Sequence, residues 1–341
     1  MNLAKLNSEV THGNFQLEKF LRDMVLAQSP SFIPGNIYVV FNTSDEAYVQ
    51  YAKDWDNLYP DGTRVVQTSL LAAYNATTSN RHDVILINGH NTHTLTAMLT
   101  VSKNRIHFMG MDAVGRRYGQ GAKVSLGVTT AATDIATILV TGVRNSFHHI
   151  KFLNSNTVTE GIYCFADGGE YTFMENCEIY KSTDLDQTGA AELVANGDSS
   201  HYKNCYIGTT VDAISGAVIR PCVTFSRGLA AASAVARDVT FENCIFARNF
   251  GNSANRFVYG AEANALERLG LFENCIFWGA ALSSAVPAQN VAFGATQTDG
   301  SVLLHNCSSV AAGTAMSTTT GVFVDSPVPT AATSGISVQA S

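Results

Sequence analysis

The chain has 341 residues, of which 46% are hydrophobic and only 14% are charged. Charged residues normally make up about 25% of a soluble domain, and this apolar composition excludes a disordered chain and a coiled coil. The formal net charge is −7, from 21 Lys and Arg against 28 Asp and Glu, which disfavours a nucleic-acid-binding protein because such proteins are normally basic.

Residues 1–33 are expected to form an N-terminal arm that contains an amphipathic helix. Residues 1–10 are mixed and polar, and no stretch of the chain approaches 18 consecutive apolar residues. We therefore expect neither a secretory signal peptide nor a membrane-spanning helix. Apolar side chains recur at helical spacing before Pro30, at Phe15, Leu17, Phe20, Leu21 and Met24. Two interpretations stay open: the helix packs back on the next segment as a cap, or these side chains contact another chain.

Residues 34–100 are expected to hold the N-terminal cap and the first coils of a repetitive domain. Two short runs at 37–41 and 83–88 are apolar and rich in β-branched or aromatic residues, as in buried strands. Between them, the apolar face over 65–74 suits a short helix. A repetitive domain needs its first coil covered from water, and this helix is a candidate for that cover.

An internal repeat built around cysteine dominates the middle of the chain, residues 101–310. Five of the seven cysteines follow an asparagine, and these pairs lie 28, 39, 31 and 32 residues apart. The pairs are Asn176–Cys177, Asn204–Cys205, Asn243–Cys244, Asn274–Cys275 and Asn306–Cys307. A short segment that recurs at such intervals is typical of a solenoid. The odd number of cysteines and the absence of a CxxC pair disfavour a disulfide framework and a zinc site.

The repeat predicts an all-β fold, a right-handed parallel β-helix. Apolar residues alternate within each unit apart from the Glu–Asn step, and turn formers rather than helices lie between units. Equivalent strands would stack about 4.8 Å apart, with cysteine over cysteine in one buried interior row and the asparagines in an amide ladder at one corner. A β-sandwich is the alternative, but it gives no reason for the Asn–Cys pair to recur.

The C-terminal segment, residues 311–341, is rich in Ala, Thr, Ser and Gly, and Asp325 is its only charged side chain. Strands are expected at 322–324 and 336–338. Because a solvated tail would normally carry more charge, we expect this segment to lie at an interface with another subunit.

Part of the chain resembles a known family. The order of a turn at 61–62, a short helix and the segment 83–110 resembles the start of pectate-lyase-like right-handed β-helix proteins. The segment 144–152 and the Glu-Asn-Cys repeats resemble the bacteriophage and virus versions of that fold. The resemblance covers about residues 60–310 and implies the β-helix. It does not fix the function, because the fold hosts lyases, hydrolases, adhesins and inert virion parts.

Catalytic chemistry is only weakly indicated. Glycoside hydrolysis needs two carboxylates about 5–9.5 Å apart, and one acidic cluster is a candidate: Asp184, Asp186, Glu192 and Asp198, with His201 nearby. The signatures of polygalacturonase-like enzymes are absent, so we expect these to be turn and loop carboxylates. The histidine pairs at 90 and 93 and at 148–149 lack a third ligand nearby, so we expect no metal and no cofactor.

Three functions remain. The favoured one is a non-enzymatic bacteriophage structural protein located in the virion, such as a capsid decoration, fibre or tail component. It would bind other capsid or tail proteins and form a homo-oligomer, for which the resemblance implies a trimer. The first alternative is a tailspike-like polysaccharide lyase or glycoside hydrolase. The second is an adhesin that binds a host-surface glycan without turnover. Nucleic acid and membrane partners are not expected.

Overall fold

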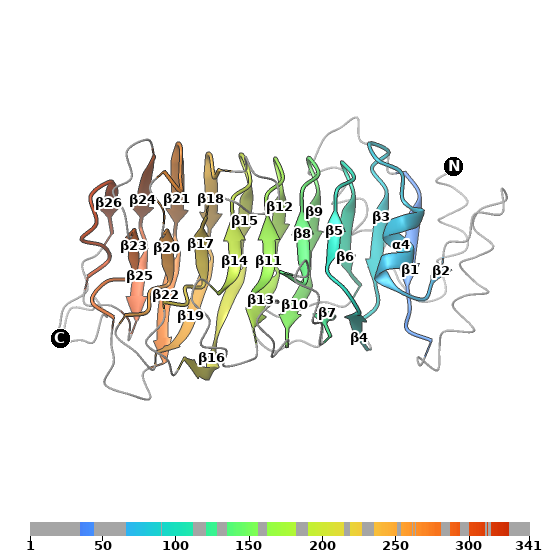
Figure 1. The fold of residues 1–341 in the computed structure, drawn as a ribbon, viewed down its shortest axis with the longest axis horizontal. Coiled ribbons are helices and arrows are strands. Elements are labelled where there is room, and N and C mark those ends of the chain that lie inside the picture. The colour runs from blue at the N-terminus through green and yellow to red at the C-terminus, as the bar shows by residue number, and fades with distance from the viewer. Residues whose placement is uncertain are drawn as a thin grey trace.

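Three parallel sheets run the length of an elongated stack of coils, shown in Figure 1. The computed structural model describes residues 35–43, 66–89, 91–111, 121–127, 135–155, 162–181, 190–214, 219–226, 235–250, 254–260, 262, 264–280, 287–293, 300–310, 312 and 315–326. The expected N-terminal arm with Phe15, Leu17, Phe20, Leu21 and Met24 lies outside the described residues, as does the strand expected at 336–338.

Each coil contributes strands to sheet A, sheet B and sheet C in turn. Sheet A contains, in spatial order, β2 (Val66–Gln67), β1 (Ile37–Val40), β3 (Val84–Ile87), β6 (His107–Gly110), β9 (Ser146–His148), β12 (Phe173–Glu175), β15 (His201–Lys203), β18 (Val239–Glu242), β21 (Leu269–Glu273), β24 (Ser301–His305) and β26 (Val322–Asp325). Sheet B contains β4 (Thr92–Leu95), β7 (Ala122–Leu126), β10 (Ile150–Asn154), β13 (Glu178–Lys181), β16 (Tyr206–Ile214), β19 (Ile245–Phe250), β22 (Ile276–Ala280) and β25 (Ser308–Val310). Sheet C contains β5 (Leu99–Val101), β8 (Ile138–Val140), β11 (Tyr163–Asp167), β14 (Ala191–Ala195), β17 (Val223–Phe225), β20 (Val258–Gly260) and β23 (Val291–Phe293). Neighbouring strands pair in parallel, as in β12 with β15 and β19 with β22, and the predicted parallel β-helix is confirmed.

Aromatic rings fill the interior behind sheet A because equivalent positions of successive coils stack. Phe108 stacks on Phe147 with ring centroids 4.8 Å apart, and Tyr202 stacks on Phe241 at 4.8 Å. Phe241 then stacks on Phe272 at 4.6 Å. These separations match the spacing of strands in a sheet, so the aromatic residues form stacks that span two or three coils, whereas Met174 and Leu304 occupy the same position in β12 and β24.

The asparagines of the repeat occupy the corner between sheets A and B. Asn176, Asn204, Asn243, Asn274 and Asn306 have φ between 48° and 54°, a left-handed conformation that asparagine tolerates better than most residues. The Asn306 side chain donates to Oδ1 of Asn274 at 2.6 Å. The backbone N–H groups at this corner bond to the next coil, as from Asn243 to the Glu273 carbonyl at 2.9 Å. Backbone geometry therefore gives a reason for asparagine at this corner, in addition to amide stacking.

The cysteines of the repeat follow that corner and are buried as free thiols: Cys177, Cys205, Cys244, Cys275 and Cys307. Each thiol reaches a carbonyl of the preceding coil, as Cys244 does with Tyr202 at 3.3 Å and Cys275 with Phe241 at 3.4 Å. A small residue with a weak donor therefore fits a narrow interior row that is lined by backbone carbonyls.

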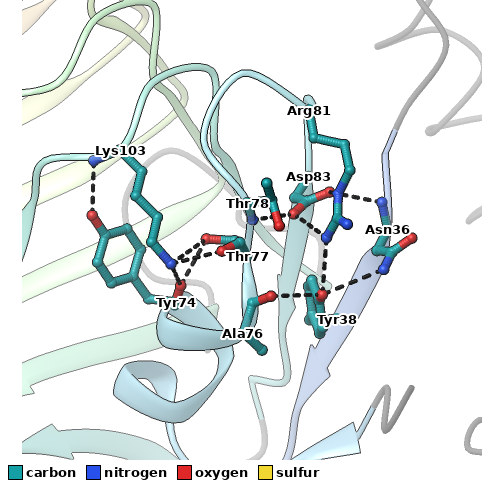
Figure 2. Close-up of polar contacts among 9 residues, drawn as sticks. All are labelled: Asn36, Tyr38, Tyr74, Ala76, Thr77, Thr78, Arg81, Asp83 and Lys103. Atoms are coloured by element: carbon teal, nitrogen blue, oxygen red, sulfur yellow. Dashed lines mark hydrogen bonds and ion pairs between the residues drawn. The ribbon is translucent and has the colours of Figure 1, made fainter. Parts of the chain in front are cut away.

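Helix α4 (Leu70–Ala76) covers the first coils, although it starts later than the range 65–74 predicts. Val66 and Gln67 instead pair with β1, and the Ser69 side chain caps the helix by accepting from the N–H of Ala72. At the other end of the helix, Lys103 Nζ donates to the carbonyls of Tyr74 and Thr77 at 2.7 Å (Figure 2). An ammonium group at a helix C-terminus satisfies carbonyls that have no partner within the helix.

A second network ties α4 to the first strands. The buried carboxylate of Asp83 accepts from the backbone N–H groups of Asn36 and Thr78 and from the guanidinium of Arg81 (Figure 2). Tyr38 completes it by donating to the Ala76 carbonyl at 2.8 Å. These contacts are all internal, and we assign this network to the cap. No helix among the described residues is both long and apolar enough to span a membrane.

Candidate functional site

The outer face of sheet A carries one polar side chain per coil in register. Alternate residues of each strand face the core, so the residue that precedes the asparagine corner faces outward. Strand pairing aligns these outward residues into what we call the charged row: His148, Glu175, Lys203, Glu242, Glu273, His305 and Asp325. Neighbours in the row are about 4.8 Å apart, so the row is straight and follows the long axis of the molecule.

The later coils of the row are partly exposed and internally paired. Lys203 Nζ lies 2.9 Å from Glu242, and His201 Nε2 lies 3.1 Å from the other oxygen of that carboxylate. His305 contacts Asp325 at 2.7 Å. An open pocket of about 400 Å³ lies at this end, lined by His305, Asn306, Asp325 and Ser326. Exposed ion pairs contribute little to stability, which leaves these groups free to exchange partners with a ligand.

At the opposite, covered end of the row, a serine lies between two histidines. Ser146 and His148 are both in β9, and Ser146 Oγ is 3.1 Å from His148 Nε2. His148 Nδ1 lies 3.5 Å from Oε2 of Glu175, which is directly opposite in β12. On the other side, His107 Nδ1 lies 2.8 Å from the same serine oxygen, and His107 Nε2 lies 3.1 Å from His82.

One placement of protons lets each of these contacts be a hydrogen bond and leaves His148 Nε2 as an acceptor for Ser146. The hydrogen bond from His148 holds the pKa of Glu175 below its ordinary value, so Glu175 is a carboxylate that accepts from His148 Nδ1. In the tautomer that donates from Nδ1, the other nitrogen is an acceptor, and in this placement Ser146 donates to His148 Nε2. Burial lowers the pKa of His107 to about 3, so His107 is neutral. In the same placement its Nδ1 donates to Ser146 Oγ and its Nε2 accepts from His82.

The acidic cluster proposed from the sequence does not gather at this face. Glu192 is in β14, and its carboxylate is bound inside the coil by Arg248, with Nη1 to Oε1 at 2.6 Å. Asp198 lies beyond the end of that strand and contacts Arg268 at 3.2 Å. Glu192 is 1% exposed and Asp198 is 27% exposed, so the two carboxylates lie in different surroundings and pair with different arginines. Asp184 and Asp186 lie outside the described residues.

Sequence reasoning missed the arrangement of Ser146, His148 and Glu175. It treated His148 as one half of an adjacent histidine pair that lacked a metal ligand, and among the described residues no group of three or more His, Cys, Asp or Glu side chains is placed to hold a metal ion. A signal was nevertheless present. His148 and Glu175 both precede a corner residue of the repeat, so a repeat alignment alone places their side chains opposite each other.

Comparisons with known proteins find similarity of fold only. No family model matches the chain, and no curated protein matches it. Among solved structures, a pectate lyase gives a TM-score of 0.55 at 12% identity over 86% of this chain and 69% of its own. A pectin methylesterase from Aspergillus niger gives 0.53 at 14% identity over 92% and 94%. A pectin methylesterase in complex with a hexasaccharide gives 0.52 at 13% identity over 86% and 81%.

Proposed function

We propose that this protein is polysaccharide-active and binds a linear glycan along the outer face of sheet A. The observation that carries the proposal is the charged row, a straight series of carboxylate, ammonium and imidazole groups with one member per coil. Phe173 adds an aromatic ring between His148 and His201, with centroids 5.5 Å from each. Solenoids present extended surfaces of this kind to extended ligands. Proteins with a similar fold include a pectin methylesterase in complex with a hexasaccharide.

The charge of the row favours an uncharged or esterified glycan over a polyuronate. Four carboxylates in the row, on Glu175, Glu242, Glu273 and Asp325, face one ammonium group, on Lys203. The whole chain also carries a formal charge of −7. A chain of carboxylate sugars would meet like charge along this face, which disfavours the encounter and the complex. Hydroxyl-rich or acylated sugars would instead receive hydrogen bonds from the row and donate to it.

Affinity electrophoresis of the full chain in gels that contain dissolved polysaccharides tests this proposal. We expect neutral or acylated polysaccharides to retard the protein and a polyuronate to leave it unretarded. Replacing Lys203→Ala together with Glu242→Gln should weaken binding about tenfold, or about 1.4 kcal/mol. The matched control is Lys151→Ala with Glu178→Gln, which removes an ion pair of the same length, 2.9 Å, from the outer face of sheet B. Equal binding by both double variants, or a preference for the polyuronate, would overturn the proposal.

A second candidate is the non-enzymatic virion role, in which the last coil docks on another chain. One observation favours it: Phe323 of β26, the last described strand of sheet A, is 60% exposed, and Val324 beside it is also exposed. Light scattering after size exclusion tests whether the last coil docks on another chain. Phe323→Ser should reduce the oligomer mass. Val211→Ser, a change at another exposed apolar residue, should leave the mass unchanged. A wild-type chain that is monomeric and absent from virus particles by immunoelectron microscopy would contradict this role.

A further inference from the structure

The serine between two histidines at the covered end of the charged row has the geometry of an acyl-transfer site. Ser146 Oγ is 3.1 Å from His148 Nε2, and Glu175 lies on the far side of the same imidazole. We infer that Ser146 is a nucleophile, that His148 is its general base and that Glu175 orients His148, so that the protein hydrolyses ester bonds of acylated sugars. The sugar part of this inference rests on the proposed function, whereas the acyl chemistry rests on these three residues.

The parallel sheet provides the arrangement. Residues two apart in a strand point to the same face, which puts Ser146 and His148 side by side, and the ladder puts Glu175 opposite His148 in the next coil. A nucleophile, a base hydrogen-bonded to it and a third group that orients the base are the features by which such sites are recognised, whatever the fold. The Glu175 contact of 3.5 Å is long, as catalytic hydrogen bonds often are before a substrate binds.

The contacts of Ser146 distinguish it from the residues at the same position in neighbouring coils. Its hydroxyl lies within hydrogen-bond distance of both His148 Nε2, at 3.1 Å, and His107 Nδ1, at 2.8 Å. Strand pairing aligns Ser146 with Phe173, His201 and Thr240 in the following coils. Within these described coils only the strand of Ser146 combines a hydroxyl with an outward histidine two residues later. The packing of the coils does not require a hydroxyl and a histidine together in this strand, because the neighbouring coils pack without that pair.

The proposed reaction balances with water as the only co-reactant. Ser146 Oγ attacks the acyl carbon of the ester while its proton moves to His148 Nε2. The tetrahedral intermediate then expels the sugar alkoxide, which takes that proton from His148, and leaves an acyl group on Ser146. Water attacks the acyl-serine, gives a proton to His148 and releases the carboxylic acid, and Ser146 recovers its proton. Glu175 stabilises the imidazolium that forms in both steps without accepting the proton itself.

Labelling with a serine-directed reagent tests the inference directly. Ser146 is only 2% exposed and His148 only 5% exposed, so the reagent must be small. The full chain is treated with a small fluorophosphonate, and labelling is measured by intact mass and peptide mapping. We expect one label per chain, on Ser146. Hydrolysis of 4-nitrophenyl acetate should fall by about 100-fold or more in Ser146→Ala and in His148→Gln. Absence of labelling on a folded wild-type chain, or hydrolysis unchanged by Ser146→Ala, would overturn the inference.

Matched variants separate catalysis from folding. His93→Gln changes a histidine of sheet B that contacts the Asn88 carbonyl rather than a serine. Ser308→Ala removes an exposed hydroxyl from sheet B. Both variants should keep the labelling and the hydrolysis rate. Glu175→Gln should lower kcat with little change in KM, and Glu175→Asp should restore part of kcat. Melting curves must show that each variant is folded. A rate unchanged in folded Glu175→Gln would refute the positioning role of Glu175.

The two proposals fail in different ways. Ser146→Ala should still be retarded by acylated glycans, because it leaves the exposed part of the charged row intact. A wild-type chain that binds such glycans but transfers no acyl group overturns the esterase inference alone. A wild-type chain that hydrolyses 4-nitrophenyl acetate through Ser146 but binds no polysaccharide overturns the proposed glycan ligand alone.

Discussion

Replacing Arg248 by methionine should lower the free energy of unfolding by about 3–5 kcal/mol. Arg248 of β19 and Glu192 of β14 are each 1% exposed and share two hydrogen bonds, of which Nη1 to Oε1 is 2.6 Å long. The change removes the guanidinium and leaves the Glu192 carboxylate inside the coil, in register with Cys164 and Cys222 of the neighbouring coils. A buried charge that loses its partner costs this much, whereas removal of both charges is often neutral or stabilising.

Urea unfolding at pH 8 measures this loss, and the double change Glu192→Leu with Arg248→Met should recover most of it. A loss below 1 kcal/mol, or a double variant as unstable as the single one, would refute this reasoning. Loss of ester hydrolysis in a stable double variant would instead give Glu192 a catalytic role.

Two further changes probe the repeat and a third probes a buried cysteine outside it, each by urea unfolding. Cys244→Leu should overpack the interior row and cost about 1–3 kcal/mol; an unchanged midpoint would mean that the row has spare room. Asn243→Ala, at φ 54°, should cost about 1 kcal/mol, and Asn249→Ala in β19 serves to compare an asparagine outside the corner. Burial raises the pKa of the Cys222 thiol to about 12, so the protonated thiol stabilises the folded state below pH 9, and this stabilisation is lost as the pH rises. Between pH 8 and pH 10 the free energy of unfolding should therefore fall by about 1 kcal/mol less in Cys222→Ala than in wild type.

The sequence predicted the coil architecture because a parallel stack places like residues over like residues. Cys244 and Cys275 lie in one buried row, and Asn243 and Asn274 lie at one corner, since each pair occupies the same place in successive coils. The geometric reason for asparagine was less visible. An amide ladder was expected, but the left-handed backbone of the corner also favours asparagine. That backbone conformation was not predicted, because the amino-acid sequence does not give φ directly.

The candidate site could not be found by looking for catalytic carboxylates in the sequence. That search looked for carboxylates close together in the chain, and it selected Glu192 and Asp198, which the structure places inside the coil and beyond the end of the strand. The charged row is instead built from residues 20 to 39 apart, because coil length varies with the loops between strands. Only a register that ignores loop length brings His148 opposite Glu175.

The coil that holds Ser146 also departs from the repeat. Where the following coils have Asn at the corner and Cys after it, this coil has His149 and Ile150, and His149 keeps the left-handed backbone at φ 56°. His149 is larger than the asparagine that occupies this corner in the following coils. Departures of a sequence from its structural pattern are expected mainly at functional sites. The adjacent departure from the pattern, Ser146 with His148, is the one that creates a hydrogen-bonded nucleophile. In a solenoid the coil that breaks the pattern is therefore the place to look for chemistry, because the regular coils already satisfy the core.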